Sequence, residues 1–507
     1  MSVRGRLISG AGVHYGGQLV ILILGLWITP LVLMLLGITN YGLWLIGQQL
    51  LTYLGLVDFG VVALLPRDLG RLRGCGSNAD DERRDLIRAA VWLSFAQGLG
   101  AALIGAVVWA HLPEAWVALR PALAITLAGS IVLAPSRVFV AVLQGEQDYS
   151  FVSGAQTLGW LTATGVSVAL LVVGCGIESL AWGWLGGQTL SPVACWLRLR
   201  ARFPAYRFAL AIWPGRTCLG RQAREGFAVT LNQFGVTLLS AIDVFLIGYL
   251  IGPAAVVVYS CTGRLILVLG NQAQAAAQMA LPTLAEIGAG GDGEQARRAA
   301  SALTLTLLLV SGLVVSVLLL VNGTFIGWWV GPEYYAGQVL NGFLLAAMLV
   351  RHWNLAVIFS LFAFGYNYRL TLTVLADGLV TLGLSYLLVN GVGSVGVPLG
   401  ALGGVALVSL PLNLFALRAT VGVGWRSIAG WAVRFVPVAG AAAWAGAVLP
   451  VPALRDPHAL FQLAAGVLGA TCVYSLVMWP VIRQTPLGTA IGSAWGRVVG
   501  RKPVEVS

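Results

Sequence analysis

Residues 225–286 read EGFAVTLNQFGVTLLSAIDVFLIGYLIGPAAVVVYSCTGRLILVLGNQAQAAAQMALPTLAE, and this stretch decides the fold class. It contains two apolar runs, each long enough to cross a bilayer, that meet at the tight turn Ile251-Gly252-Pro253. The first run carries Asp243 and the second carries Arg264, both far from the ends of their runs. A charge at the centre of a membrane helix costs about 2.5 to 3.5 kcal/mol on insertion scales, so such an ion indicates a functional site.

On each of these two predicted helices, polar residues at helical spacing share a face with the charge. The two stripes are Asn232, Ser240 and Asp243 on the first helix, and Arg264, Asn271, Gln274 and Gln278 on the second. Polar stripes inside apolar helices either line a water-filled cavity or form a hydrogen-bonded seam between helices. We favour the cavity, and the seam remains the alternative.

The composition of the whole chain indicates an all-α polytopic membrane protein. Of its 507 residues, 58% are hydrophobic and 10% are charged, whereas a soluble domain carries about 25% charged residues. The apolar runs predict about fourteen transmembrane helices. These lie at residues 13–36, 41–65, 86–110, 118–143, 151–174, 177–197, 226–250, 253–285, 299–321, 338–364, 369–390, 394–417, 428–449 and 458–482.

The basic residues predict the orientation of these helices. With the N-terminus inside, 24 of the 30 Lys and Arg residues fall in inner segments, whereas the outer segments hold Arg120 and Arg455. This asymmetry places both termini in the cytoplasm. Of the basic residues, 29 are Arg and only Lys502 is Lys, which with the abundant Ala and Gly indicates a high-GC bacterial genome, so we expect a bacterial plasma (inner) membrane. The asymmetry also accounts for the net charge of +11 without nucleic-acid binding. Arg434, near the inner end of its helix, is expected to extend its guanidinium toward the interface.

A basic segment rich in aromatic residues divides the chain. The predicted parts are an N-terminal six-helix lobe (1–198), a cytoplasmic interfacial linker (199–225), a C-terminal six-helix lobe (226–418), an additional helix pair (428–482) and a cytoplasmic tail (483–507). Matches between the lobes, such as Pro192 with Pro411, recur at a steady shift of 215 to 220 residues. We therefore expect the lobes to be repeats related by a pseudo-two-fold axis along the membrane normal.

Two segments carry a family resemblance. Residues 36–70, LGITNYGLWLIGQQLLTYLGLVDFGVVALLPRDLG, and residues 242–265, IDVFLIGYLIGPAAVVVYSCTGRL, resemble the O-antigen and polysaccharide flippases (Wzx type) of the MOP superfamily. The resemblance implies two six-helix lobes around a central cavity, a monomer, and the membrane lipids as surroundings. The additional helix pair departs from the twelve-span flippases and is closer to the lipid II flippase.

The resemblance also implies a function. Such flippases move undecaprenyl-diphosphate-linked oligosaccharide from the cytoplasmic to the outer leaflet by alternating access, for exopolysaccharide or O-antigen synthesis. They are transporters rather than enzymes, and polysaccharide polymerase or export machinery would be the protein partners. A multidrug or cation antiporter of the same superfamily is the alternative. A membrane polymerase or ligase is less favoured, because those enzymes need a large outer loop and every outer loop here is short.

Arginines at membrane depth are the candidate substrate ligands. Guanidinium groups bind the planar oxygens of phosphates bidentately, so we expect Arg137, Arg264 and Arg351 to bind the lipid diphosphate. In the alternative, each arginine pairs with a buried acid and only fixes helix packing. The other residues of the predicted cavity are Asn232, Asn271 and Gln274.

Acidic residues are the candidate coupling and gate residues. Asp243 is expected either to couple transport to protons or sodium ions or, with slight preference, to pair with Arg264. Asp58 and Asp377, near the inner ends of their helices, are predicted to form gate ion pairs with Arg67 or Arg369, and interfacial capping is an equal alternative. The sequence predicts no catalytic residue, resident cofactor or metal site, and its six cysteines have no metal-binding spacing.

Overall fold

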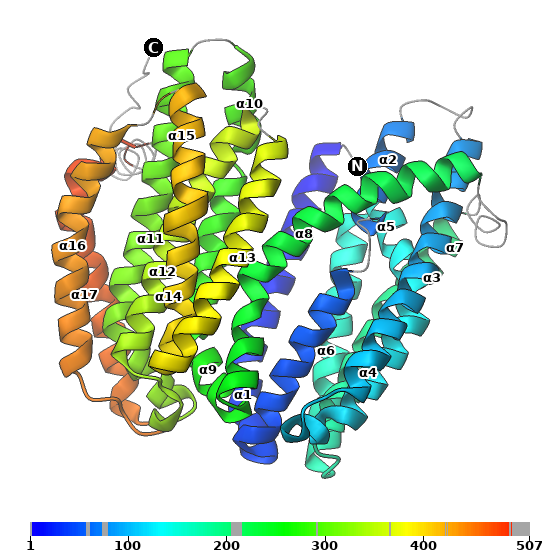
Figure 1. The fold of residues 1–507 in the computed structure, drawn as a ribbon, viewed down its shortest axis with the longest axis horizontal. Helices are drawn as coiled ribbons and strands as arrows, with labels where there is room; N and C mark the ends of the chain where they lie inside the picture. The colour runs from blue at the N-terminus through cyan, green and yellow to red at the C-terminus, as the bar shows by residue number, and fades with distance from the viewer. Residues whose placement is uncertain are drawn as a thin grey trace. The chain divides into compact units, whose positions relative to one another are not determined.

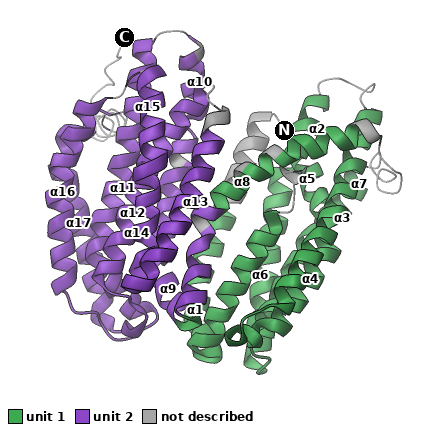
Figure 2. Cartoon of the chain, viewed as in Figure 1, with its two compact units in different colours: residues 1–237, 252–254 green, residues 238–251, 255–507 purple. Residues whose placement is uncertain are grey.

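The computed structural model describes residues 3–56, 61–73, 80–203, 215–290, 293–364, 367–420, 422, 424–485 and 488, and their regular structure is entirely helical (Figure 1). The chain forms two compact units. The first contains residues 1–237 and 252–254, and the second contains residues 238–251 and 255–507 (Figure 2). The division falls inside the helix that follows the predicted linker 199–225, and the additional helix pair 428–482 belongs to the second unit. The predicted symmetry between the two lobes stays a prediction.

The first unit is a set of helices that pack along a shared apolar core. They are α1 (Val3–Gly55), α2 (Val61–Arg73), α3 (Asp80–Ala110), η3 (Glu114–Leu119), α4 (Arg120–Leu133), η4 (Ala134–Ser136), α5 (Arg137–Gly145), α6 (Tyr149–Val172), α7 (Glu178–Arg202) and the first part of α8 (Arg216–Leu250). Two predicted spans merge in α1 at Gly37, whose φ of 74° strongly favours glycine. Buried residues such as Leu69, Leu86 and Val142 join α2, α3 and α5.

The second unit is built around α11, which contacts α12, α16 and α17 (Figure 1). Its elements are the last part of α8, most of α9 (Pro253–Gln278), α10 (Leu281–Ala289), α11 (Gly293–Trp329), η6 (Pro332–Tyr334), α12 (Gln338–Ala363), α13 (Asn367–Val392), η7 (Gly393–Val395), α14 (Gly396–Gly404), the π-helical turn η8 (Val405–Ser409), α15 (Leu410–Thr420), α16 (Trp425–Val448) and α17 (Pro457–Ile482). The hydroxyl group of Tyr474 donates to the carbonyl oxygen of Leu309 at 2.7 Å, which ties α17 to α11.

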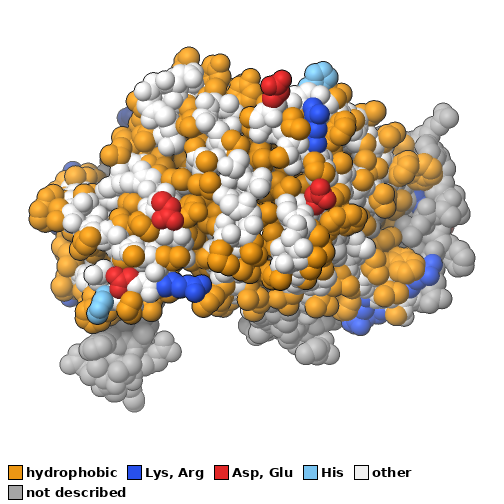
Figure 3. Space-filling model, turned by 90° about the horizontal axis from the view of Figure 1, so that it is seen from below, with side chains coloured by type: hydrophobic (Ala, Val, Ile, Leu, Met, Phe, Trp, Pro, Cys, Tyr) orange, Lys and Arg blue, Asp and Glu red, His pale blue; other side chains and the backbone are white. Residues whose placement is uncertain are grey.

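Helices cover each of the predicted spans, although not every predicted span is a separate helix. Within the described residues, ten helical segments are long and apolar enough to cross a bilayer, and a bent pair in α8 makes eleven. Two of the ten, Gly16–Gly55 and Leu370–Thr420, each cover two predicted spans, and α7 covers a further one. Large apolar side chains such as Val433 and Leu476 are about three-quarters exposed. Such side chains along α16 and α17 need lipid around them, and the prediction of an all-α polytopic membrane protein is confirmed. Figure 3 shows the molecule from below, at the ends of its helices, where charged side chains are also few among apolar ones.

Candidate functional site

The α8–α9 hairpin brings a carboxylate and a phenol together inside the second unit. Asp243 and Tyr259 each lie eight residues from Ile251 in the turn, so the two antiparallel helices carry them at about the same height. The hydroxyl group of Tyr259 donates to Oδ2 of Asp243 at 2.7 Å. The other carboxylate oxygen, Oδ1, is buried and has no hydrogen-bond partner among the described residues. Asp243 therefore retains one oxygen that can accept a further bond.

Arg351 of α12 completes this group, which we call the Asp243 cluster (Asp243, Tyr259 and Arg351). Its positive charge acts on both Asp243 and Tyr259, although no ion pair with Asp243 within 4.0 Å is formed. Nη2 of Arg351 is buried and finds no hydrogen-bond partner in the part of the chain that the structure describes. The cluster thus offers both an N–H donor and a carboxylate acceptor to a polar ligand.

Arg264 does not belong to this cluster. It follows Tyr259 by five residues, which moves it about 7.5 Å along α9 and turns it by about 140° around the helix axis. It forms no ion pair with any described residue, and its Nε is buried without a hydrogen-bond partner. The preferred pairing of Asp243 with Arg264 was therefore wrong. The helical rise places Tyr259, not Arg264, opposite the carboxylate.

Arg264 instead heads a polar stripe along α9 that contains Asn271 and Gln274. Seven residues make almost two helical turns, so Asn271 lies on the same face as Arg264. Asn271 is exposed and Gln274 is half-buried, and neither side chain hydrogen-bonds to a described residue. We call Arg264, Asn271 and Gln274 the α9 stripe. Asn232, the predicted cavity residue on α8, has a side chain that lies outside the described residues.

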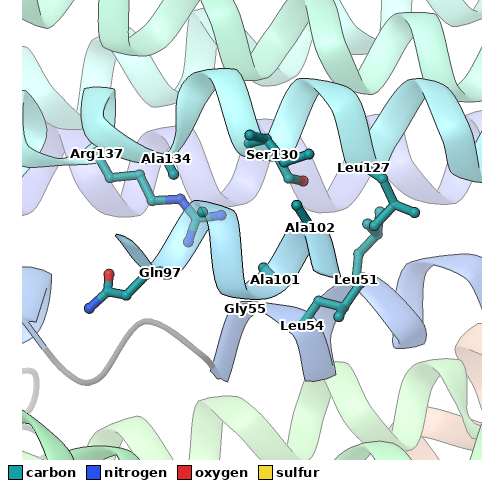
Figure 4. A pocket seen from close by; sticks show the side chains of 12 residues that line it. Leu51, Leu54, Gly55, Gln97, Ala101, Ala102, Leu127, Ser130, Ala134 and Arg137 are labelled. Carbon is teal, nitrogen blue, oxygen red and sulfur yellow. The ribbon is translucent and has the colours of Figure 1, made fainter. Parts of the chain in front are cut away.

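Arg137 lines a pocket in the first unit (Figure 4). The 3₁₀ turn Ala134–Ser136, which contains Pro135, interrupts the helix immediately before it, so that Arg137 begins α5. The pocket has a volume of about 510 Å³, part of it open to solvent, and Gln97 and Ser130 are its other polar residues. Its remaining wall is apolar, with Leu51 and Leu54 from α1. Arg137 forms no ion pair with the described residues, so a single cation stands in an apolar pocket.

The predicted gate residues lie in different surroundings. Arg67 donates to Oδ1 of Asp68 at 2.9 Å and to Oε2 of Glu225 at 3.0 Å, which joins α2 to α8 within the first unit. The hydrogen bond to Asp68, aided by Glu225, raises the pKa of the Arg67 guanidinium above its ordinary value. Asp58 lies outside the described residues, and so does the side chain of Arg369. The pairing of either residue in a gate therefore stays a prediction.

Asp377 is 2% exposed and sits in a hydrogen-bonded network. Its Oδ2 accepts from the Ser409 hydroxyl at 2.5 Å and its Oδ1 from the Thr381 hydroxyl at 3.0 Å. The amide of Asn354 donates to Ser409 at 3.0 Å, and Asn413 donates to Asn354 at 2.9 Å. We call these five residues the Asp377 network. Ser409 ends the π-helical turn η8, a local widening of the helix that often accompanies function.

Sequence reasoning missed Tyr259 and the partners of Asp377. The signal for Tyr259 was present, because its distance from the turn equals that of Asp243. Thr381 lies one helical turn after Asp377 on α13, but the other members of the network come from three other elements, up to 36 residues away from Asp377, and no local pattern in the chain identifies them. His352 is also buried, and its Nδ1 lies 2.7 Å from the hydroxyl oxygen of Ser311.

Comparisons with known proteins identify a family for this chain and solved structures that share its fold. A family model described as "Polysaccharide biosynthesis protein" matches residues 78–335. No curated protein matches the sequence significantly. The solved structure of lipid II flippase MurJ, in an inward closed conformation, has a TM-score of 0.66 at 12% identity, covering 93% of this chain and 99% of that chain. An inward-facing multidrug resistance MATE family transporter of the MOP superfamily has a TM-score of 0.60 at 14% identity, covering 76% and 94% respectively. At these identities the likeness shows a shared fold.

Proposed function

Because this chain belongs to the family of polysaccharide biosynthesis proteins, we propose that it is a flippase for a lipid-linked oligosaccharide. In this proposal it carries polyprenyl-diphosphate-linked oligosaccharide from the cytoplasmic to the outer leaflet of a bacterial plasma membrane. It works by alternating access, has both termini in the cytoplasm, and serves the synthesis of O-antigen or exopolysaccharide. A fold shared with a lipid II flippase supports the proposal.

The observation that carries the proposal is the state of the deep arginines. Arg264 and Arg351 each keep a buried nitrogen without a partner among the described residues, and neither pairs with an acid. A buried donor that lacks a partner costs about 1 to 3 kcal/mol, more for a charged group, so such groups call for a bound polar ligand or water. A diphosphate supplies negative charge and several acceptor oxygens that match guanidinium geometry.

The rest of the substrate also suits the α9 stripe. An oligosaccharide presents many hydroxyl groups, and the side-chain amides of Asn271 and Gln274 can both donate to and accept from them. The polyprenyl tail has no need of a polar site, because it stays in the hydrocarbon of the bilayer. Recognition in this proposal therefore falls on the diphosphate and the nearest sugars.

A multidrug or cation antiporter is the competing proposal. It would need a negative site for its cargo. The Asp243 cluster holds one carboxylate and one guanidinium, and the α9 stripe adds the charge of Arg264. The summed charge of these groups is +1 with Asp243 ionised, which favours an anionic cargo.

We also propose Asp243 as the residue that couples transport to a proton or sodium ion. Its Oδ1 is free to take a proton, and its Oδ2 is held by the hydroxyl of Tyr259. Loss of its charge would remove a negative charge that acts on Arg351, and would thereby strengthen the attraction of Arg351 for an anionic substrate. Coupling of this kind predicts that the ion and the substrate affect each other's affinity.

The test is complementation of a bacterial strain that lacks this chain, with surface polysaccharide as the readout. Arg264→Ala and Arg351→Ala each remove a charged partner of the diphosphate, an effect worth about 2 to 5 kcal/mol, so we expect export to fall at least tenfold. The lipid-linked oligosaccharide should accumulate where only reagents from the cytoplasmic side reach it.

Arg434→Ala is the matched control. Arg434 also lies in a membrane helix, but its Nη1 donates to the carbonyl oxygen of Gly430 on its own helix at 2.8 Å. It should support normal export. Normal polysaccharide in both Arg264→Ala and Arg351→Ala, with both variants inserted at wild-type levels, would overturn the proposal. Efflux of a cationic dye by the wild type, lost in Asp243→Asn, would establish the antiporter instead.

A further inference from the structure

A second basic site lies in the second unit, apart from the deep arginines. A cleft of about 1200 Å³, part of it open to solvent, forms where the first turns of α11 and α16 meet the end of α17. Its polar lining residues are Arg297, Arg298, Ser301, Ser427, Arg483, Gln484 and Thr485. We call this cleft the basic pocket. Ala302 and Leu305 of α11 add an apolar wall.

The charges of the basic pocket do not cancel. Arg297 and Arg298 share one acid, because both donate to Glu294 over distances of 2.8 to 3.0 Å. Arg483 forms no ion pair with any described residue, and its guanidinium lies 4.9 Å from the centre of the Trp479 ring. Three guanidinium groups thus face one carboxylate, which leaves a surplus of two positive charges. No acidic residue lines the pocket within the described chain.

Neutral donors point to the same kind of ligand. The hydroxyl groups of Ser301 and Ser427 line the pocket and have no hydrogen-bond partner among the described residues. Ser427 lies in the first turn of α16, where the helix dipole is positive and the first backbone N–H groups lack helical partners. Guanidinium, hydroxyl and helix N-terminus together form a binding site for phosphate oxygens.

The surroundings favour a phosphate that belongs to a lipid. Trp425 at the start of α16 is 49% exposed and Trp479 near the end of α17 is 37% exposed, and exposed Trp at helix ends is typical of the membrane interface. Farther along the same two helices, Val433, Val436 and Leu476 expose apolar side chains. An acyl chain can therefore follow α16 and α17 while its headgroup stays in the basic pocket. A free phosphate has no acyl chain to cover this apolar surface.

We propose that the basic pocket binds the headgroup phosphate of an anionic phospholipid and holds α16 and α17 against α11. Basic pockets between membrane helices on the cytoplasmic side are suited to anionic headgroups. The site is distinct from the one proposed for the transported substrate, because none of its residues belongs to the Asp243 cluster or the α9 stripe. Its ligand is a resident lipid of the membrane, so the inference stands whatever the cargo is.

The experiment uses the purified full-length chain in detergent. Phosphatidylglycerol or phosphatidylcholine is added in increasing amounts, bound lipid is counted by native mass spectrometry, and thermal unfolding is followed by tryptophan fluorescence. We expect phosphatidylglycerol to bind and to raise the unfolding temperature, and phosphatidylcholine to do neither. Arg483→Gln should weaken phosphatidylglycerol binding about fivefold, the effect of one basic residue at a membrane surface.

Two variants make the outcome decisive. Ser427→Glu brings a negative charge into the pocket and should weaken binding to a similar extent, while Glu in the first turn of a helix favours folding. Arg418→Gln is the matched control, because Arg418 is exposed in the last turn of α15, near the start of α16, but does not line the pocket. It should bind phosphatidylglycerol as the wild type does.

Three results would overturn the proposal. Wild-type affinity in Arg483→Gln and Ser427→Glu would show that the lipid binds elsewhere. An equal loss of phosphatidylglycerol affinity in Arg418→Gln would show that the lipid is attracted by surface charge in general and not by the basic pocket. A similar rise in unfolding temperature with inorganic phosphate, together with displacement of the lipid, would identify a free-anion site. If Arg483→Gln does not fold, the phosphatidylglycerol affinities of Ser427→Glu and Arg418→Gln are sufficient to test the proposal.

Discussion

Two carboxylates buried within the second unit, Asp243 and Asp377, differ in how their oxygen atoms are used. Both oxygens of Asp377 accept hydroxyl hydrogen bonds, and further bonds from Asn354 and Asn413 extend the network across α12, α13, η8 and α15. Asp243 accepts one bond, from Tyr259, and its second oxygen has no partner among the described residues. The carboxylate of Asp377 thus has hydrogen bonds to both oxygens, whereas the carboxylate of Asp243 has a hydrogen bond to only one.

The difference separates stability from ligand binding. A fully bonded polar network in a low-dielectric interior fixes one arrangement of the helices around it. An incomplete group keeps donors and acceptors for something that is not part of the chain. We therefore expect substitutions in the Asp377 network to act on stability first, and substitutions in the Asp243 cluster to act on transport first.

The largest effect on stability should come from Asp377→Ala. It removes the acceptor for Ser409 and Thr381 and leaves both hydroxyl groups buried, at a cost of about 1 to 3 kcal/mol for each. Thermal unfolding of the purified protein, with the yield of folded protein from membranes, measures the loss. Gly404 allows the close approach on which the network depends, because a Cβ there would lie 2.5 Å from Oδ1 of Asp377.

Asp377→Asn is the control for this prediction. The amide keeps an acceptor oxygen and the volume of the side chain, so it should lose less stability than alanine. If Asp377→Ala is as stable as the wild type but cannot transport, Asp377 belongs to the transport machinery. The contrast between the two carboxylates would then fail.

Much of the fold could be predicted from the sequence, because membrane helices are marked by apolar length and the chain contains little else. The all-helical class, the Ile251-Gly252-Pro253 turn and the membership of a polysaccharide biosynthesis family are confirmed, and the fold is shared with the lipid II flippase structure. The exact division into units was harder to predict, because it falls inside α8, a bent helix that contributes to both units.

The site could be predicted only in part, for geometric reasons. Charge inside an apolar run marks a residue as unusual, but does not say which neighbour meets it. The prediction that Asp243 pairs with Arg264 did not take the rise of the two helices into account. The number of residues between each side chain and the turn gives that rise, and it matches Asp243 with Tyr259. The contacts of Asp377 depend on the packing of four helical elements, and of the π-helical turn in particular, for which the local sequence carries no clear signal.

Tyr259→Phe should have an intermediate effect. It removes one hydrogen bond, to Oδ2 of Asp243, and leaves the ring in place, so stability should fall by about 0.5 to 1.5 kcal/mol. Export in the complementation assay should fall further than this loss explains, because the carboxylate of Asp243 loses the bond that fixes its orientation. A variant that loses stability but exports normally would make the Asp243 cluster a packing contact, like the Asp377 network.

Arg434→Ala should have the smallest effect, although it removes a charge from a membrane helix. Nη1 of Arg434 donates a hydrogen bond to the carbonyl oxygen of Gly430, one turn away on α16, so this bond does not join α16 to another element. Substitutions of this kind, away from buried networks, change stability by about 0.5 kcal/mol or less. The measurement is thermal unfolding beside Arg351→Ala, which removes the same group from a helix where it has no such bond. If Arg434→Ala loses as much stability as Asp377→Ala, a hydrogen bond within one helix does not distinguish arginines without a function from arginines that bind a ligand. The missing hydrogen bonds of Arg351 would then no longer indicate a function.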